Sequence, residues 1–275
     1  MSARHTSIGV FDSGFGGLTV LRELLRLVPG ADYTYFGDAA RLPYGSKSPE
    51  TVARYSSAAA RRLEDGGAEL LVIACNTATA LALPAIAAAV KVPVVGVVEP
   101  GAEAAASATK RNNVVVIATE ATVHSHAYKT ALESRGVRVR EKACPLFVPL
   151  VEEGWLDHPV TQTVAHVYLD EFFHDYESGP DVLVLGCTHY PLIKHILRSV
   201  APWRITLVDS AEATARAVAQ RLQVEPLPPA SKGEERRQAP RLQCFTTDSV
   251  EKFRRLGELF LSYPIERVEH AQLEP

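Results

Sequence analysis

Two stretches of the chain share one pattern, and this pattern limits the possible folds more than any other feature. Residues 70–74 and 182–186 are apolar runs that end in a small residue. Each run is followed at once by a cysteine, Cys75 or Cys187, and then by polar residues. After the second run, Pro191 suits the first turn of a helix. Short continuous apolar runs are typical of strands buried on both faces, so both stretches predict buried strands of a parallel sheet.

Strands and helices alternate along the rest of the chain. Further strands are predicted at residues 7–11, 33–36, 92–98, 113–118, 137–142, 205–208, 242–246 and 265–269. Helices are predicted between them, among others at residues 18–28, 49–65, 119–136, 159–178 and 211–222. This alternation is typical of the α/β class with mainly parallel sheets flanked by helices. We expect two similar domains, residues 1–98 plus 209–275 and residues 99–208, with the active site in the cleft between them.

Three local predictions depend on single patterns. Residues 99–101 (Glu-Pro-Gly) predict a turn between the domains. The helix opened by Pro159 is expected to face inward with its apolar side chains, Val160, Val164, Val167 and Phe172. Residues 226–242 are rich in proline and in balanced charge, which predicts an exposed, mobile connection without a binding role.

Composition excludes several classes of protein. The 275 residues are 47% hydrophobic and 22% charged, with a net charge of −3, which is typical of soluble globular proteins and argues against nucleic acid as a partner. The four cysteines are far apart, a pattern that favours reduced thiols in a cytoplasmic protein. Residues 1–7 do not resemble a signal peptide, and no apolar run is long enough to span a membrane.

The two cysteines suggest a reaction that needs two like groups. Cys75 and Cys187 follow strands in similar contexts, so we expect them to enter one cleft from opposite sides. A nucleophilic hydrolase uses one thiol, and a redox pair commonly has CxxC spacing. Inversion of a carbon stereocentre uses two groups, because one thiolate removes a proton from one face while the other thiol supplies one to the opposite face. Helix N-termini are expected to lower the pKa of both thiols.

Neighbouring residues fit this chemistry. His189 is placed to move a proton to or from Cys187, and Asp12 to do the same for Cys75. Asn76, Thr77 and Thr188 are donors suited to a substrate carboxylate. The glycine-rich turn at residues 12–17 suits a small anion about as well as it suits a plain strand-to-helix turn. No lysine lies in a pyridoxal-phosphate setting and no metal-ligand cluster is present in the sequence, so no cofactor and no metal are expected.

Four blocks carry a resemblance to a known family. Residues 12–20 (DSGFGGLTV), 43–45 (PYG), 74–78 (ACNTA) and 185–191 (LGCTHYP) resemble the signature blocks of glutamate racemases, in the cofactor-independent aspartate/glutamate racemase superfamily. The resemblance implies that the protein interconverts L-glutamate and D-glutamate and supplies D-glutamate for peptidoglycan. It also implies that Cys75 deprotonates D-glutamate and Cys187 deprotonates L-glutamate.

The same resemblance implies roles for other residues. Asp12, Glu152 and His189 would assist as acid/base groups. The substrate would be held by Asp12, Ser13, Tyr44, Gly45, Asn76, Thr77, Thr119, Thr122, Thr188 and His189. Members of the family commonly form homodimers, so a homodimer is expected here.

The sequence leaves two other functions open. One is racemisation of aspartate or another small acidic amino acid, because pocket length cannot be derived from the motifs. The other is a regulator that binds an amino acid and retains the thiols without turnover.

Overall fold

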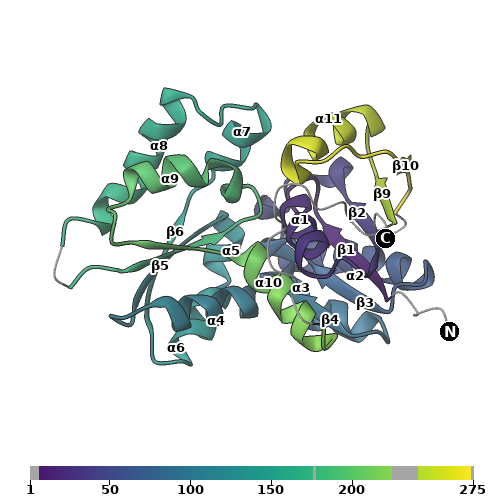
Figure 1. Cartoon of the computed structure of the whole chain (residues 1–275), viewed down its shortest axis with the longest axis horizontal. Coiled ribbons are helices and arrows are strands. Elements are labelled where there is room, and N and C mark those ends of the chain that lie inside the picture. The colour runs from purple at the N-terminus through teal and green to yellow at the C-terminus, as the bar shows by residue number, and fades with distance from the viewer. Residues whose placement is uncertain (1–5, 176–177, 225–240, 274–275) are drawn as a thin grey trace.

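The structure is a computed structural model that describes residues 6–175, 178–224 and 241–273. Within these ranges the strands form two sheets, each in its own half of the molecule (Figure 1). In the first sheet, strands run in the order β10 (Val268–His270), β9 (Leu242–Thr246), β2 (Asp32–Gly37), β1 (Ser7–Asp12), β3 (Leu70–Ile73), β4 (Val94–Gly96). In the second, the order is β6 (Arg138–Ala143), β5 (Asn113–Ala118), β7 (Val182–Gly186), β8 (Thr206–Asp209).

Every strand pair within these two sheets is parallel, which confirms the predicted class. β3 and β7, the two apolar runs that precede the cysteines, are buried along their whole length, and each has a neighbouring strand on both sides. Such strands must be apolar on both faces because helices cover both sides of the sheet.

Helices flank both sheets (Figure 1). Those of the first half are α1 (Leu18–Leu27), α2 (Pro49–Asp65), α3 (Asn76–Ala89) and α11 (Val250–Leu261). Those of the second half are α4 (Val98–Ala108), α5 (Glu120–His124), α6 (Ala127–Glu133), α7 (Phe147–Glu152), α8 (Pro159–Leu169) and α9 (Lys194–Val200). α10 (Ser210–Arg221) packs on α1 and on α4, and so joins the halves. Short 3-10 turns lie at Ala39–Arg41, Tyr44–Ser46, Asp170–Phe172 and Tyr190–Ile193.

The register of the strands places the two cysteines. In the first sheet Phe11 of β1 pairs with Ile73 of β3, so Asp12 and Cys75 lie at the same carboxyl edge. In the second sheet Ala118 of β5 pairs with Gly186 of β7, which sets Thr119 beside Cys187. The carboxyl ends of parallel strands are where open α/β sheets bind ligands.

Two local predictions, a turn at residues 99–101 and a single helix at residues 119–136, are wrong. Residues 99–101 do not form a turn but lie in the first turn of α4, where Pro100 is tolerated because the N–H groups of a first turn lack intrahelical partners. The single helix predicted at residues 119–136 is two helices, α5 and α6, because His126 adopts a left-handed backbone (φ 54°) between them.

The predicted inner face of α8 is also partly wrong. Val160 and Val167 are 42% and 72% exposed, whereas Thr161, Ala165 and Leu169 are buried. The apolar residues of this helix cover more than one stripe, so their spacing alone does not identify the stripe that faces the sheet. Phe172, just beyond the helix, is buried as expected.

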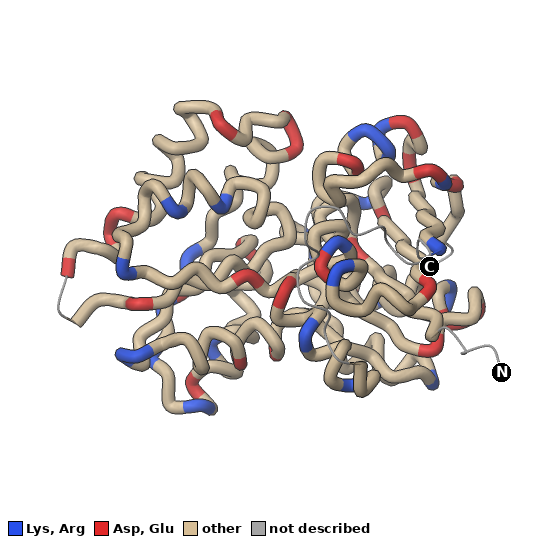
Figure 2. The backbone as a smooth tube through the Cα atoms, viewed as in Figure 1, with Lys and Arg blue, Asp and Glu red and all other residues tan. Residues whose placement is uncertain are grey.

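Most of the predicted connection at residues 226–242 lies outside the described residues; its last residue, Leu242, begins β9. No helix among the described residues is long and apolar enough to cross a membrane. Figure 2 marks the positions of acidic and basic residues along the backbone, and both kinds occur in both halves.

Candidate active site

Cys75 and Cys187 line one cavity between the two halves, with a volume of about 40 Å³. Both thiols are buried, at 5% and 6% exposed. The remaining lining residues come from loops and helix starts of both halves: Ser13, Leu42, Pro43, Tyr44, Gly45, Asn76, Thr77, Thr119, Val148, Thr188 and His189. The fold therefore brings together segments that are far apart in the sequence at the carboxyl edges of both sheets.

Cys75 lies at the start of α3. The backbone N–H of Ala78 donates to its sulfur at 3.4 Å, and the thiol donates to the Ser13 hydroxyl at 3.5 Å. Burial, and after it the charge of Asp12, raises the pKa of Cys75 to about 12. This outcome differs from the expectation that the helix N-terminus lowers the pKa, because loss of solvent outweighs the helix and the hydrogen bonds. Cys75 is therefore a protonated thiol at neutral pH in this structure.

Asp12 is a buried carboxyl group at the end of β1. Its Oδ2 accepts a hydrogen bond from the N–H of Gly14 at 2.8 Å, while its Oδ1 has no partner among the described residues. Burial raises the pKa of Asp12 and outweighs the lowering effect of nearby His189. Because the charge of Asp12 also acts on Cys75, this carboxyl group is a candidate acid/base partner for the thiol.

Cys187 has a different partner. The Nδ1 atom of His189 lies 3.9 Å from its sulfur, and the Nε2 atom of the same ring lies 3.1 Å from Oε1 of Glu152. Burial lowers the pKa of His189, but the hydrogen bonds with Cys187 and Glu152 outweigh this effect and raise the pKa to about 10. At neutral pH the ring is therefore an imidazolium, placed between the sulfur of Cys187 and the side chain of Glu152. It packs edge-on against Phe260 of α11.

Pro191 lies in the first turn of a helix, as the sequence suggested, but this turn is a 3-10 helix at Tyr190–Ile193, and the α-helix begins only at Lys194. The two thiols thus stand in unlike local structures, although the strands before them match.

Hydroxyl groups gather on one side of the cavity. Thr77, Thr119 and Thr122 lie within 2.9–3.3 Å of one another. Thr77 and Thr119 line the cavity. Thr122 lies behind them and is hydrogen-bonded to both hydroxyl groups. On the same wall, Gly45 approaches Thr119 so closely that a Cβ there would lie 3.1 Å from that of Thr119.

Tyr44 lines the cavity, but its hydroxyl group is already engaged. It donates to Oδ2 of the buried Asp38 at 2.6 Å. Arg41 and Thr247 bind the other oxygen of this carboxylate. The ring of Tyr44, more than its hydroxyl, is therefore what faces the cavity.

The glycine-rich turn packs directly on the opposite half. A Cβ at Gly16 would lie 2.2 Å from Oγ1 of Thr188 and 2.7 Å from Nδ1 of His189. Thr19 donates to the backbone carbonyl of Thr188 at 3.1 Å. Glycine is needed here for close approach, a role that the sequence alone did not distinguish from anion binding.

The sequence prediction missed the apolar lining residues Leu42, Pro43 and Val148. Pro43 belongs to the block at residues 43–45 that resembles the family, so the sequence offered a reason to expect Pro43 and the preceding Leu42 near the site. Val148 carried none, because a valine in α7 has no feature that sets it apart from core residues.

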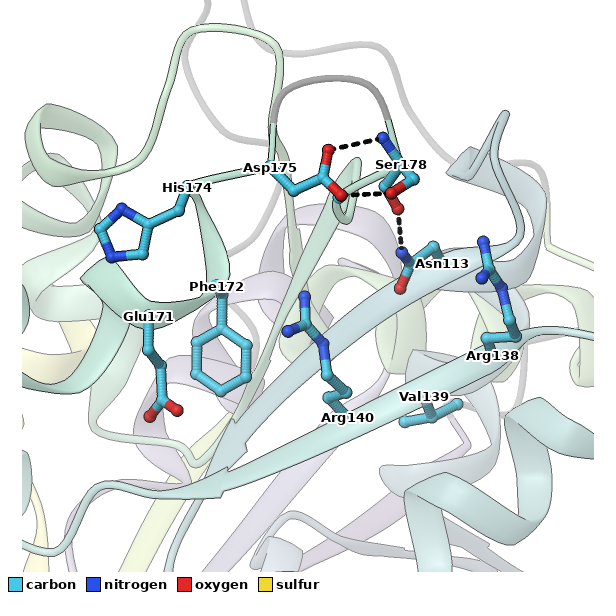
Figure 3. Close-up of a pocket in the computed structure, with 10 residues that line it drawn as sticks. Asn113, Arg138, Val139, Arg140, Glu171, Phe172, His174, Asp175 and Ser178 are labelled. Atoms are coloured by element: carbon cyan, nitrogen blue, oxygen red, sulfur yellow. Dashed lines mark hydrogen bonds between the residues drawn. The ribbon is translucent and has the colours of Figure 1, made fainter.

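A larger hollow of about 420 Å³ lies elsewhere, at β6 on the outer edge of the second sheet (Figure 3). Arg138 and Arg140 extend into it from β6, and the guanidinium of Arg140 lies 4.8 Å from the centre of the Phe172 ring. It shares no residue with the cavity of the two cysteines. Since it contains no cysteine, it does not compete as the site of thiol chemistry.

Comparison with known proteins gives one consistent result. The family model described as Asp/Glu/Hydantoin racemase matches residues 8–218. A glutamate racemase from Koribacter versatilis is 56% identical over 99% of this chain and 99% of its own length.

Solved structures agree in fold. A glutamate racemase isoform from Bacillus anthracis matches with a TM-score of 0.88 and 35% identity, covering 98% of both chains. A glutamate racemase from Francisella tularensis, solved in complex with D-glutamate, matches with a TM-score of 0.85 and 32% identity, again over 98% of both chains.

Proposed function

Because the chain belongs to the Asp/Glu/hydantoin racemase family, we propose that it is a glutamate racemase that interconverts L-glutamate and D-glutamate without a cofactor. The observation that carries the proposal is that Cys75 and Cys187, from two different sheets, line one cavity. Full-length similarity to glutamate racemases supports glutamate as the substrate in preference to aspartate.

The proposed reaction uses the thiols in turn. In the L-to-D direction the Cys187 thiolate removes the α-proton of L-glutamate, and the Cys75 thiol donates its proton to the opposite face. In the D-to-L direction the roles reverse. Each turnover leaves one sulfur protonated and the other deprotonated, so the protons must redistribute before the next turnover in the same direction.

Charged neighbours of the thiols support this redistribution. The His189 imidazolium, held by Glu152, stabilises the thiolate form of Cys187 because it places a positive charge 3.9 Å from the sulfur. Asp12, next to Cys75, is the group that accepts and returns a proton on the other side. Asp12, His189 and Glu152 are thus proposed as acid/base groups.

Donors in the cavity wall would hold the substrate. The proposed binding residues are Asp12, Ser13, Tyr44, Gly45, Asn76, Thr77, Thr119, Thr122, Thr188 and His189. Removal of the α-proton places negative charge on the α-carbon and, by delocalisation, on the adjacent carboxylate. Hydroxyl and amide donors fixed in a buried site stabilise that charge more than water does, because they need no reorganisation.

Hydrogen exchange tests the proposal. The purified protein, with no pyridoxal phosphate added, is incubated with L-glutamate in D₂O, and α-deuterium incorporation and D-glutamate are measured. Cys75→Ala and Cys187→Ala should each abolish racemisation. Cys244→Ala is the matched control, since this thiol is fully buried in β9 outside the cavity. Exchange with aspartate but not glutamate would contradict the substrate, and exchange with neither would favour an amino-acid-binding regulator.

Four further parts of the proposal follow the family. The domains are residues 1–98 plus 209–275 and residues 99–208. The protein is a cytoplasmic homodimer and supplies D-glutamate for peptidoglycan. Light scattering coupled to size exclusion tests the dimer, and depletion in a cell that requires D-glutamate tests the supply.

A further inference from the structure

Asn76 is the first residue of α3, and a hydrogen bond fixes the orientation of its side-chain amide. It is 3% exposed and lines the cavity beside Cys75. Its Oδ1 accepts a hydrogen bond of 2.7 Å from the hydroxyl group of Tyr128. Its Nδ2 is buried and has no partner among the described residues. A buried amide donor without a partner costs free energy, so such a group in a cavity points to a ligand that would accept its hydrogen bond.

Tyr128 comes from the other half of the molecule. It belongs to α6 and is fully buried, whereas Asn76 begins α3 of the first half. A hydrogen bond also links its side chain to that of Ser210, at the start of α10. Gly101 of α4 makes room for the phenol, because a Cβ at that position would lie 3.1 Å from the hydroxyl oxygen. Three segments of the chain therefore hold this hydroxyl group against the amide.

We propose that Tyr128 is a positioning residue that holds the Asn76 amide with its NH₂ group toward the cavity, where it donates to a carboxylate of the substrate. This inference rests on the proposed function, which makes an amino dicarboxylate the ligand. A side-chain amide can rotate by a half-turn, and the two orientations differ in whether NH₂ or C=O faces the ligand. In the rotated form a carbonyl oxygen would face a carboxylate, and the two would repel each other.

The phenol of Tyr128 selects one orientation of the Asn76 amide, because its hydroxyl group donates to Oδ1 and could not donate to the NH₂ group in that place. The bond is lost when the hydroxyl is removed. Without it, Oδ1 becomes a buried acceptor with no partner, and the amide no longer has a preferred orientation. One neutral hydrogen bond contributes about 0.5–1.5 kcal/mol, which corresponds to a change of roughly two- to thirteenfold in an equilibrium.

The first test is Tyr128→Phe. We expect kcat/KM for glutamate to fall roughly two- to thirteenfold, and the affinity for D-glutamate, measured by calorimetry, to fall by a similar factor. Tyr33→Phe is the matched control, since Tyr33 is also buried and its hydroxyl group donates to the carbonyls of Leu24 and Val28, away from the cavity. Both variants should lose similar thermal stability, but only Tyr128→Phe should lose activity and affinity.

The second test separates amide orientation from a simple link between the halves. In Asn76→Asp, the carboxylate still accepts from Tyr128 but has no NH₂ to donate to the substrate, so activity and affinity should fall at least as far as in Asn76→Ala. In the double variant of Tyr128→Phe with Asn76→Ala, the tyrosine change should have little further effect, because its partner is already gone.

The outcomes are distinct. If Tyr128→Phe behaves like Tyr33→Phe, if Asn76→Asp retains wild-type activity, or if the two changes are additive, the positioning role is overturned. If the wild-type protein binds glutamate with the expected dependence on Tyr128 but does not racemise it, the proposed function fails while the positioning role stands. If it binds no glutamate, both fail.

Discussion

The imidazole of His189 bridges Cys187 and Glu152, with its Nδ1 3.9 Å from the sulfur and its Nε2 3.1 Å from the carboxylate oxygen. Glu152 is one of the groups that raise the pKa of His189 to about 10. It therefore controls the pH range over which the ring remains charged beside the thiol.

Glu152→Gln should lower the pKa of His189 and move the alkaline limb of the pH–activity profile to lower pH, because activity is lost as His189 loses its proton. The value of kcat/KM should fall about tenfold at neutral pH, as expected for loss of one charge-assisted hydrogen bond. Initial rates from pH 6 to 10 measure both. Glu153→Gln is the control, since Glu153 is exposed and adjacent. An unchanged alkaline limb in Glu152→Gln would contradict the role of this carboxylate.

The loss should be equal in the two directions. L-glutamate and D-glutamate are mirror images with equal free energies in water, so kcat/KM in one direction must equal kcat/KM in the other for every variant. The unlike environments of Cys75 and Cys187 can therefore give the two directions different kcat values and different KM values. The ratio of the two kcat values must then equal the ratio of the two KM values.

Asp12→Asn should make Cys75 more reactive toward iodoacetamide. The charge of Asp12 contributes to the raised pKa of Cys75, so its removal lowers that pKa and increases the thiolate fraction. Peptide mapping at pH 8 without substrate gives the rate at each cysteine. In the wild-type protein Cys75 should react more slowly than a free thiol, and Cys244, which is fully buried, should stay unlabelled in both proteins. Slower labelling of Cys75 in Asp12→Asn would refute the coupling.

Stability should depend on pH through His189. The pKa of this group is raised from its ordinary 6.5 to about 10 in the folded protein, so its stabilising effect is complete below pH 6.5 and is lost as pH rises toward 10. Melting temperatures of the wild type and of His189→Asn, measured from pH 6 to 10, should converge over this window. Cys75, with its own raised pKa, affects both proteins equally above pH 9 and cancels in the difference. A constant difference across the window would count against a charged His189.

Gly16→Ala should reduce activity strongly and destabilise the protein by about 1–3 kcal/mol, since the added Cβ would overlap Thr188 and His189. Gly30→Ala is the control: it lies in an exposed turn, and a Cβ there meets nothing within 4 Å. Activity assays and denaturant melts on both variants measure the effects. Near-normal turnover in Gly16→Ala would show that the halves do not need this close approach.

Much of this architecture was predictable because it depends on local patterns. The apolar runs before Cys75 and Cys187 identified buried strands, and the N-cap Ser48 with Pro49 identified the start of α2. The side-chain surroundings were less predictable. The raised pKa of Cys75 depends on burial by residues distant in the sequence, and the link from Tyr128 to Asn76 joins helices from different halves. No local pattern encodes such contacts, because they arise only when the chain has folded.

The small volume of the cavity between Cys75 and Cys187 has a dynamic consequence. About 40 Å³ accommodates a few water molecules but not an amino acid with a five-carbon chain. We therefore expect the two halves to move apart when the substrate enters. The chain passes from the first half to the second between β4 and α4 and returns at Asp209–Ser210, where α10 packs on both α1 and α4, so we expect the hinge there. Such an opening would break the hydrogen bond from Thr19 to the carbonyl of Thr188, and its rate would be an upper limit on turnover.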